Sequence, residues 1–357
     1  MAFISHRRKI LTDKKCKNAP LPSNQKISIV IITHNRKQKL SRLVGSLVCQ
    51  DLASVNEIII VNDCSSDGTS EMLKQTYGDH QKVKIFTNST NMMASASRNR
   101  GADAATGDFI IFLDDDVVVK NTFINDFINE INIKGSEATI LSPIMFEFKF
   151  SEITWFKGMR LNMWTTHGTF IEQGKPKDQL DKSIDWLPSD ALVTAFGLRK
   201  ADYIEIGGFD EENFPFQFEE MDFFVRARYL GYRLQVSTAI ELFHDHEVGS
   251  FLNNPWRSYY TAKNRLLICK LWSTSRLQYW VAMFFAFVHL AAYVLLKFTR
   301  YKQRRMDCFR ALYDGTLDGL KTVGGVVPYR SRQGYRTCLF LQSSVEHQFK
   351  QKLSPAR

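Results

Sequence analysis

The sequence lacks the marks of a secreted, disulfide-stabilised or zinc-stabilised protein. Its six cysteines are scattered, with no Cys-x-x-Cys pair and no zinc-like spacing, which favours reduced thiols in a cytosolic protein. The first residues contain no apolar stretch long enough for a signal peptide, so we expect no secretion. No internal repeat or low-complexity tract is present. An apolar content of 44% argues against disorder, and 357 residues allow one large domain or two modest ones.

Acidic residues are scarce at both ends of the chain. Of the net charge of +10, residues 1–17 contribute +5 and residues 297–357 contribute +9, which leaves −4 for residues 18–296. We therefore expect a mildly acidic body with a basic arm over residues 1–25 and a basic tail. Basic tails can bind nucleic acid, but the chain lacks a pattern of interleaved aromatic and basic residues, so we expect no nucleic-acid partner.

One long run carries no formal charge: the seventeen residues from Trp280 to Leu296, with His289 near the middle. This length is at the lower limit for a membrane span. Basic residues follow at once, which suits the anionic cytoplasmic face of a membrane. A helix lying in the membrane interface is the favoured interpretation; a true span and a buried helix are the alternatives. We expect an apolar, basic helical extension over residues 266–357 and a cytoplasmic location on, or anchored in, the inner face of the cytoplasmic membrane.

Strand and helix patterns alternate in the first third of the chain. Apolar runs typical of buried strands cover residues 27–32, 57–61, 83–86 and 108–113. Between them, helical patterns cover residues 40–48, a short stretch from about 70, and residues 95–105. The alternation predicts an α/β fold with a doubly wound, mostly parallel sheet.

The pattern weakens after about residue 135. A further strand fits residues 138–143, whereas residues 147–182 are aromatic and irregular, as in an adaptable binding loop. We expect regular structure to resume near Trp186, with a helix from about Glu219 and a strand over residues 234–243.

Three adjacent acids, Asp114, Asp115 and Asp116, end the apolar run of the fourth predicted strand. Ligands of open α/β sheets bind at the carboxyl ends of strands. Three neighbouring carboxylates repel one another unless a cation or a sugar hydroxyl compensates them. The alternative for such a triplet is a solvated turn.

Polar segments follow the first two predicted strands and open a later helix. They are Thr33–Arg36, Asn62–Asp63 and Ser97–Gly101. Asp63 could accept a hydrogen bond from a nucleotide base or cap the next helix, for which Asp67 is the better placed residue. Arg98 near a helix start is unfavourable for the helix dipole, which an anionic ligand nearby would explain.

Together these segments resemble glycosyltransferase family 2, whose members have the GT-A fold. The resemblance covers roughly residues 27–265 and rests on six segments in register, namely 29–36, 59–69, 96–102, 112–116, 207–212 and 218–233. It implies a GT-A domain over residues 26–265, with a nucleotide-sugar half (26–135) and an acceptor half (136–265). The Gly207–Asp210 segment and the basic tail are most similar to rhamnosyltransferase-like bacterial members.

The resemblance also implies roles for the residues at the strand ends. Asp114 matches the first acid of the family's Asp-x-Asp motif, which touches ribose. Asp116 matches the second, which binds Mg²⁺ or Mn²⁺, a hard cation that neutralises charge on the departing diphosphate. The donor-binding residues that follow from the resemblance are Thr33, Asn35, Asp63, Arg98, Asp114 and Asp115.

The general base is expected in the segment Glu219-Glu220-Met-Asp222, which matches the family's Glu-Asp-x-Asp. Glu220 stands in the place of the family's catalytic aspartate and is one methylene longer, so it can still deprotonate a hydroxyl within hydrogen-bond reach. Glu219 and Asp222 are the catalytic alternatives, although a charged helix start stabilised by its dipole fits those two better than it fits Glu220.

Two histidines follow on the last predicted strand. His244 matches a histidine that contacts the metal or the diphosphate, and His246, two residues on, is the second metal-ligand candidate. Further on, Tyr259–Arg265 resembles a late segment of the family. This segment either steadies the nucleotide phosphates or packs its helix.

The resemblance implies a metal-dependent inverting glycosyltransferase that moves a sugar from a nucleotide-diphosphate sugar to an acceptor hydroxyl. The Gln-x-x-Arg-Trp signature of processive members is absent, so transfer of single sugars is expected. The basic, apolar C-terminal region suggests a saccharide or lipid-linked acceptor, as in surface polysaccharide or glycolipid assembly. A catalytically silent, membrane-associated scaffold is one alternative. A sugar nucleotidyltransferase is the other, but it needs a glycine-rich loop that Thr33–Arg36 does not provide.

Overall fold

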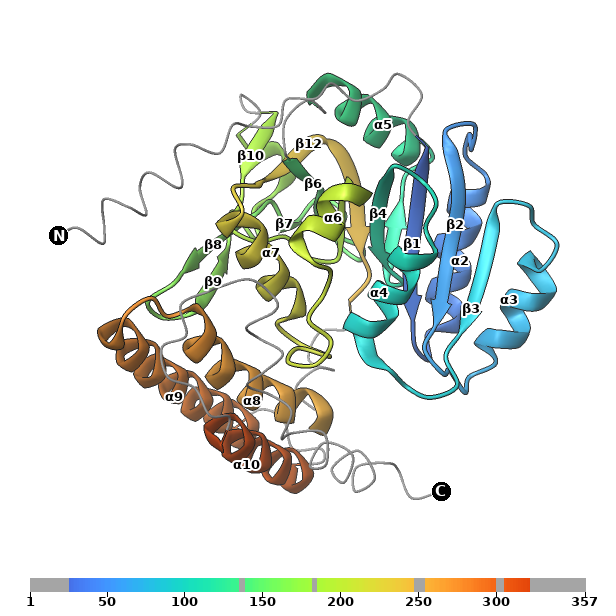
Figure 1. Cartoon of the computed structure of the whole chain (residues 1–357). Helices are drawn as coiled ribbons and strands as arrows, with labels where there is room; N and C mark the ends of the chain where they lie inside the picture. Colours follow the sequence, from blue (N-terminus) through green and yellow to red (C-terminus); the bar gives the residue numbers. More distant parts are fainter. Residues whose placement is uncertain (1–25, 135–138, 182–184, 247–253, 300–304, 322–357) are drawn as a thin grey trace. The chain divides into compact units, whose positions relative to one another are not determined.

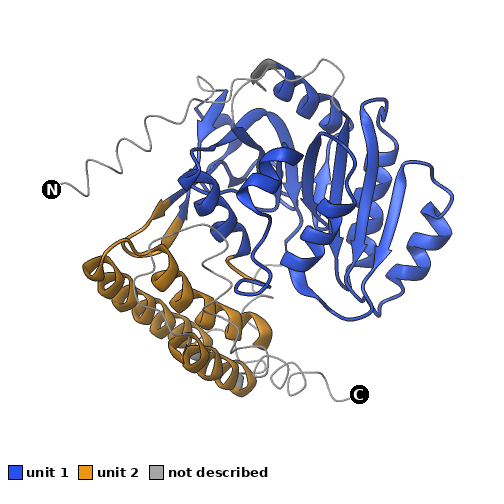
Figure 2. Cartoon of the chain, viewed as in Figure 1, with its two compact units in different colours: residues 1–160, 169–215, 219–246 blue, residues 161–168, 216–218, 247–357 orange. Residues whose placement is uncertain are grey.

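The computed structural model describes residues 26–134, 139–181, 185–246, 254–299 and 305–321. The chain forms two compact units, which Figure 2 shows in different colours. The first comprises residues 1–160, 169–215 and 219–246, and the second comprises residues 161–168, 216–218 and 247–357. The predicted arm over residues 1–25 lies outside the described residues, as does the end of the predicted extension, 322–357. The domain boundaries expected from the sequence stay predictions.

Figure 1 shows the arrangement of the elements and labels most of them. The strands are β1 (Ile27–Thr33), β2 (Val55–Asn62), β3 (Val83–Thr87), β4 (Phe109–Asp114), β5 (Val117–Val119), β6 (Thr139–Glu147), β7 (Thr154–Phe156), β8 (Met159–Asn162), β9 (His167–Phe170), β10 (Trp186–Pro188), β11 (Ala195–Arg199) and β12 (Arg233–His244). The helices are α2 (Lys37–Val48), α3 (Thr69–Tyr77), α4 (Met93–Ala104), α5 (Phe123–Lys134), the 3-10 turn η1 (Lys177–Gln179), α6 (Lys200–Ile206), α7 (Glu219–Tyr229), α8 (Pro255–Trp272), α9 (Arg276–Thr299) and α10 (Arg305–Lys321).

The first unit is built on one large mixed sheet, with the strand order β10-β12-β6-β11-β4-β1-β2-β3. Strand β1 is parallel to both β2 and β4, and β2 is parallel to β3. Strand β11 is antiparallel to both β4 and β6, and β12 is parallel to β6. The predicted α/β fold with a mostly parallel sheet is therefore confirmed, and β11 is the antiparallel strand in its middle.

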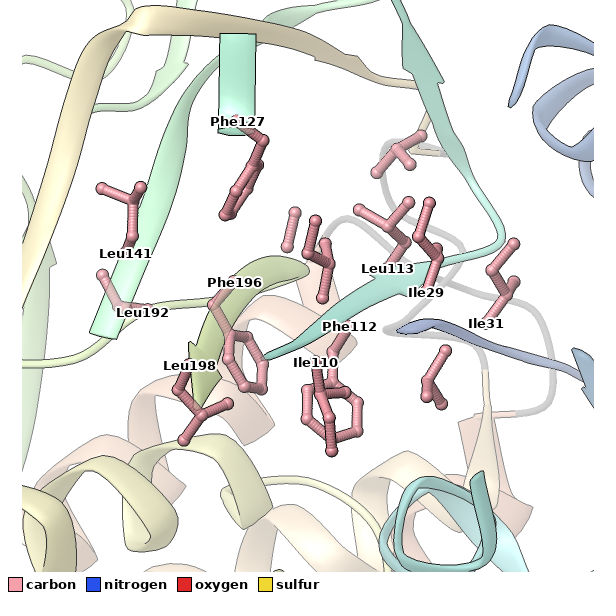
Figure 3. Close-up of a cluster of buried hydrophobic side chains, with 14 of the residues drawn as sticks. Ile29, Ile31, Ile110, Phe112, Leu113, Phe127, Leu141, Leu192, Phe196 and Leu198 are labelled. Atoms are coloured by element: carbon pink, nitrogen blue, oxygen red, sulfur yellow. The ribbon is translucent and has the colours of Figure 1, made fainter. Parts of the chain in front are cut away.

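The centre of the sheet is hydrophobic on both faces, as the continuous apolar runs predict. Ile29 and Ile31 of β1 and Phe112 of β4 are almost completely buried in one cluster (Figure 3). Helix α4 packs closely on this centre at Gly101, where an added Cβ would lie 2.4 Å from Val30 Cγ1. A larger residue at position 101 would therefore push α4 away from the sheet.

The aromatic segment expected to be an irregular loop, residues 147–182, contains short elements. Strand β7 pairs with β6, β8 pairs with β9 in a separate two-stranded sheet, and η1 follows. These strands are three or four residues long. Such short stretches cannot display the period-2 alternation that identifies a strand from sequence.

The described residues of the second unit include the helices α8, α9 and α10. Helix α8 begins with Pro255, and the side chain of Asn254 caps it by accepting hydrogen bonds from the backbone N–H groups of Trp256 and Arg257. One face of α9 packs on its neighbours, because Ala282, Met283 and Ala286 cluster with Leu266 and Cys269 of α8.

The other face of α9 is apolar and exposed. Trp280, Phe284 and Leu295 are 66%, 64% and 63% exposed. By length and composition alone, the stretch from Arg276 to Lys297 could cross a membrane: its mean hydropathy reaches 1.9, and 22% of that window is buried. The uncharged run seen in the sequence thus lies within the longer helix α9, one face of which packs on α8 while the other is exposed among the described residues.

Candidate active site

The candidate site begins at the carboxyl end of β4. Strand β1 lies between β2 and β4 and is parallel to both, and Thr33 at its end is opposite Asn62 of β2. The polar residues that follow these strands therefore converge at one edge of the sheet. Asp115 and Asp116, which connect β4 to β5, are only 4% and 6% exposed. The acidic triplet is therefore not a solvated turn.

Arg36 compensates two acids of the triplet. Its Nη1 donates hydrogen bonds to Asp115 Oδ1 at 2.9 Å and to Asp116 Oδ2 at 2.7 Å. Thr33 Oγ1 donates to the other oxygen of Asp115 at 2.6 Å. Burial and the neighbouring charge of Asp116 raise the pKa of Asp115 to about 6, although Arg36 opposes the shift. Asp115, enclosed by these partners, serves to anchor Arg36 and Thr33.

His244, the last residue of β12, lies beside Asp116. Its Nε2 atom is 3.3 Å from Asp116 Oδ1, and this oxygen accepts no hydrogen bond from the residues that the structure describes. Burial alone would raise the pKa of Asp116, but His244, Arg36 and Lys39 outweigh it and hold this pKa below its usual range. Asp116 thus keeps its negative charge and has one oxygen open to a further ligand.

His246 has different surroundings. Its Nδ1 is 3.4 Å from Glu147 Oε2, and its ring stacks on that of His244 with centroids 5.0 Å apart. Trp155 covers His244, with ring centroids 4.0 Å apart. Of the two histidines, His244 is therefore the one that faces the acidic triplet.

The residues around Asp116 fit a divalent cation that arrives together with its substrate. In the part of the chain that the structure describes, no three His, Cys, Asp or Glu side chains are grouped as a complete protein cage for a metal. Asp116 Oδ1 is nevertheless a buried oxygen without a hydrogen-bond donor, beside His244. Mg²⁺ usually takes one or two protein carboxylates and completes its shell with substrate phosphates and water. Asp116 and His244 are the residues that could hold such an ion.

A second cluster forms around Arg98 of α4. Arg98 Nη2 donates to Asp114 Oδ1 at 2.8 Å and to Glu220 Oε1 at 3.1 Å, and Nη1 donates to Glu219 Oε1 at 3.0 Å. Glu219 and Glu220 open α7, and Arg98 is only 4% exposed. One buried guanidinium therefore serves three carboxylates, which leaves the cluster with an excess of negative charge.

This excess acts on Glu220. Burial is the largest influence, and with the charges of Asp114 and Glu219 it raises the pKa of Glu220 to about 8. Arg98 and the backbone N–H of Thr194, which donates to Glu220 Oε1 at 3.0 Å, act in the opposite direction. A carboxyl group with a raised pKa has a high proton affinity, which suits it to accept a proton from a hydroxyl group near neutral pH.

Asp222 is not part of this cluster. Its carboxylate accepts a hydrogen bond from Arg226 Nε at 2.8 Å, one turn along α7, and it is 2% exposed. Arg226 also donates to the carbonyl of Ile206 at the end of α6. Asp222 therefore stabilises the packing of α7, and the two glutamates remain as candidates for the base.

Asp63 caps a helix, although not the one that follows it directly. Its two oxygens accept hydrogen bonds from the backbone N–H groups of Met92 and Met93, at the start of α4, each at 2.8 Å. Asn88 donates to it as well, at 2.7 Å. Asp67 instead accepts from the N–H of Thr69, the first residue of α3, at 3.2 Å. Asp63 thus fixes α4, the helix that carries Arg98.

Asn35 lies on an exposed turn beside Asp63. Its φ of +54° is in the left-handed region, and its Oδ1 accepts the backbone N–H of Ser66 at 2.7 Å. Its own N–H donates to Ser65 Oγ at 2.9 Å. The turns after β1 and β2 are thereby tied together.

Three groups of this site have no role in the sequence-based expectations: Arg36, Lys39 and the backbone N–H of Thr194. Arg36 belongs to the segment Thr33–Arg36 after β1. Because three adjacent acids need a neighbouring cation, Arg36 could have been identified from the sequence as their partner. No sequence signal points to Lys39 or Thr194. Lys39 acts on Asp116 from a distance, and the N–H of residue 194 donates to Glu220, 26 residues further along the chain.

A model described as "Glycosyl transferase family 2" matches residues 28–207. The chain is 35% identical over 92 residues to a GalNAc(5)-diNAcBac-PP-undecaprenol beta-1,3-glucosyltransferase of Campylobacter jejuni, which covers 26% of the chain and 29% of that protein. It is 28% identical over 141 residues to the poly(ribitol-phosphate) beta-N-acetylglucosaminyltransferase TarS of Staphylococcus aureus, which covers 36% and 24%. The chain thus matches under a third of the length of either relative.

Two solved structures share the fold. TarS residues 1–349 of S. aureus, in complex with UDP-GlcNAc, superpose with a TM-score of 0.52 at 19% identity, covering 81% of this chain and 80% of that one. The mannosyltransferase PcManGT of Pyrobaculum calidifontis, in complex with GDP-Man and Mn²⁺, gives 0.51 at 12% identity and covers 90% and 94%. At these identities the likeness is one of fold, and it agrees with the expected GT-A architecture.

Proposed function

The chain belongs to glycosyl transferase family 2, and on that premise we propose that it transfers a single sugar from a nucleotide-diphosphate sugar to an acceptor hydroxyl, with inversion and with the help of Mg²⁺ or Mn²⁺. The observation that carries the proposal is Glu220. Its pKa is raised to about 8, and Arg98 ties it to Asp114, at the carboxyl end of the sheet.

Glu220 is the general base of the proposed reaction. Arg98 and the N–H of Thr194 fix the orientation of its carboxylate, since both donate to Oε1. Oε2 is then left to accept the proton of the acceptor hydroxyl as the hydroxyl oxygen attacks the anomeric carbon. Attack from the face opposite the diphosphate forms one bond and breaks the other in a single displacement, which inverts the anomeric configuration.

Asp116 and His244 serve the departing diphosphate. A divalent cation held there would supply Lewis-acid stabilisation of the charge that develops on the leaving group. Arg36 contacts Asp115 and Asp116 and fixes the side chains that face this position. Asp114, held by Arg98, remains the proposed ribose contact, beside Thr33, Asn35 and Asp63 on the donor side.

The test starts with the donor. Purified protein is screened by thermal shift against uridine, thymidine and guanosine diphosphate sugars, rhamnose donors included, each with and without Mn²⁺. A ligand that binds only the native state raises the midpoint by mass action. We expect a shift from one nucleotide class that needs the metal, and sugar transfer that is lost in Glu220→Gln while donor binding survives. A cooperatively folded protein without any metal-dependent shift would contradict the proposal and favour the silent scaffold.

We further propose that the acceptor is lipid-linked or lies at a membrane surface. The name of the Campylobacter relative refers to an undecaprenol-linked substrate, and exposed Trp280, Phe284 and Leu295 form an apolar face on α9. The opposite face of α9 packs on α8, a helix with buried charged residues such as Lys270. A spanning α9 would either leave α8 or take these charges into lipid. We therefore propose that α9 lies in the interface plane, on the cytoplasmic side of the membrane.

Vesicle binding tests this placement. The variant Trp280→Glu/Phe284→Glu should no longer sediment with anionic vesicles, whereas Tyr313→Glu should, because Tyr313 is a similarly exposed aromatic residue (64%) on α10. Binding by an interfacial helix with basic flanks should also weaken as salt rises. Unchanged sedimentation of the double variant would contradict the interfacial placement.

A further inference from the structure

The three residues that precede α7, Phe216–Phe218, have an unusual backbone. Gln217 and Phe218 both have positive φ, +64° and +65°, although neither is glycine. L-residues with side chains rarely adopt this left-handed conformation, and two in succession persist only where the surroundings hold them. Phe218 is followed directly in the chain by Glu219 and Glu220. The conformation of this segment therefore determines the direction in which the backbone enters α7, the helix that carries the proposed base.

Asn264 of α8 holds this segment. Its Nδ2 donates hydrogen bonds to the carbonyl oxygens of Phe216 at 2.9 Å and Gln217 at 2.8 Å. Asn264 is completely buried, and its Oδ1 accepts no hydrogen bond from the described residues. The two carbonyls thus account for the hydrogen bonds of this amide. Both are peptide groups next to a left-handed residue.

Two arginines of α8 also contact the segment Phe216–Phe218. The guanidinium of Arg265 lies over the ring of Phe218, 5.2 Å from its centroid, and that of Arg257 lies over Phe216 at 5.4 Å. Every residue of the segment is therefore in contact with α8. The sequence left two roles open for Tyr259–Arg265, contact with the nucleotide phosphates or packing of the helix, and these contacts are of the packing kind.

We propose that Asn264 is a positioning residue for the general base: it keeps Gln217 and Phe218 left-handed, so that the chain enters α7 with Glu220 aimed at Arg98. The inference rests on the proposed function of Glu220. Without Asn264, both residues would relax toward negative φ, and the first turn of α7 would lose its fixed start. The catalytic carboxylate would then be misplaced without any change to a residue that touches substrate.

Hydrogen exchange tests the proposal without a substrate. In Asn264→Ala, the amides of residues 217–222 should exchange about tenfold faster than in the native protein, while those of β1 and β4 are unchanged. The matched control is Ser258→Ala, which removes a different buried hydrogen-bonding side chain of α8, one that contacts Tyr293. Should the alanine variant fail to fold, Asn264→Ser retains one donor and should give an intermediate effect.

Glycine at position 217 separates positioning from general packing. Glycine adopts positive φ about as readily as negative φ, so Gln217→Gly should make the turn less dependent on Asn264. The loss caused by Asn264→Ala should accordingly be smaller in the Gln217→Gly background than in the native one. Equal losses in both backgrounds would overturn the proposal.

Turnover of the donor found in the thermal-shift screen supplies the functional arm. We expect Asn264→Ala to lower kcat about 10- to 100-fold with little change in the KM for the donor, since a misplaced base costs rate and leaves donor binding intact. A higher donor KM with unchanged kcat would instead assign Asn264 to the nucleotide phosphates. If no donor is turned over at all, the proposed function fails, while the exchange experiment still decides whether Asn264 holds the segment.

Discussion

Two arginine–carboxylate clusters lie at the end of β4, and one acid of each, Asp116 and Glu220, has its pKa shifted in the opposite direction from the other. Around Arg36, the pKa of Asp116 is held low because Arg36, Lys39 and His244 surround it. Around Arg98, the pKa of Glu220 is raised to about 8. Asp116 is buried, the side chain of Glu220 is 16% exposed, and both carboxyl groups contact a guanidinium. Burial raises the pKa of both groups, and the neighbouring charges decide the net direction: His244, Arg36 and Lys39 outweigh burial at Asp116, whereas at Glu220 the charges of Asp114 and Glu219 add to burial and outweigh Arg98.

The difference also gives the clusters opposite effects on folding stability. Asp116 has a folded pKa below its unfolded value, so its stabilising contribution is present above that value and lost on acidification. Glu220 has a folded pKa above its unfolded value of about 4.5, so its contribution is present at low pH and lost as pH rises through about 8. Asp116 is thus held in its charged form, whereas Glu220 is disposed to take up a proton.

Replacement of Glu220 by glutamine should have the largest effect on transfer. The amide cannot accept a proton from the acceptor, so we expect turnover to fall by about 10²- to 10⁴-fold with donor binding retained. Single-turnover measurements with and without acceptor give the number. The control is Glu219→Gln, which alters the same cluster without removing the proposed base. A larger loss in the control would reassign the base to Glu219.

The same variant should gain stability at alkaline pH. Since ionised Glu220 destabilises the native state above about pH 8, Glu220→Gln should raise the free energy of unfolding at pH 9 by about 1–3 kcal/mol. The gain should shrink toward pH 5, where the native carboxyl is protonated. Urea unfolding at both pH values measures it. A gain that does not depend on pH would show that ionisation is not its cause.

Asp116→Ala should remove metal dependence from the first cluster. We expect a loss of about 10³-fold in transfer, the order of the Lewis-acid contribution, and no Mn²⁺-dependent thermal shift with donor. Asp126→Ala, which removes an acid of α5 outside the clusters, should leave both readouts unchanged. A Mn²⁺-dependent shift that survives in Asp116→Ala would move the metal to other ligands.

Arg98→Met tests the second cluster through stability. Removal of its single guanidinium leaves Asp114 and Glu219 uncompensated, and Glu220 as well once it ionises, so we expect the free energy of unfolding to fall by about 3–5 kcal/mol at pH 9. The loss should be smaller at pH 5.5, where Glu220 carries its proton. Arg100→Met is the matched control, because Arg100 lies on the same helix but donates to the Thr87 carbonyl and to Asn88 rather than to an acid. Equal losses in the two variants would indicate that charge compensation is not the cause.

The sequence predicts the strands and the acidic residues of the two clusters better than the contacts that these residues make. The apolar runs identify β1, β2 and β4, because a buried parallel strand is a continuous apolar run. Asp114, Asp115 and Asp116 are predicted at the site because ligands bind at the carboxyl ends of such strands. The partners of these acids are not local. Asp63 caps a helix that starts 30 residues later, and the amide of Asn264 bonds to carbonyls 47 and 48 residues before it. Such contacts depend on how distant elements pack together, and the hydrophobic periodicity of the sequence does not predict this packing.

The position of β11 between β4 and β6 is another feature that cannot be predicted from the sequence. Its five residues are apolar enough for a buried strand, but nothing local shows that they run antiparallel to β4. This placement brings Thr194, directly before β11, to the end of β4, where its N–H reaches Glu220. The charge environment of the proposed base therefore depends on a strand direction that only the fold reveals.

The smallest expected effect comes from Lys39, which lowers the pKa of Asp116 through its charge and donates to the carbonyl of Asp245. The variant Lys39→Met removes this positive charge, so the site should attract another cation more strongly. We expect Mn²⁺ to bind about two- to fivefold more tightly in the presence of donor, which is the effect of one charge that is partly screened by solvent and salt. Titration of the thermal shift with Mn²⁺ gives the affinity. Lys37→Met, on the exposed side of the same helix, should change it less. If Lys39→Met weakens Mn²⁺ binding, the contact with Asp245 matters more than the charge, and the low pKa of Asp116 must then be assigned to Arg36 and His244.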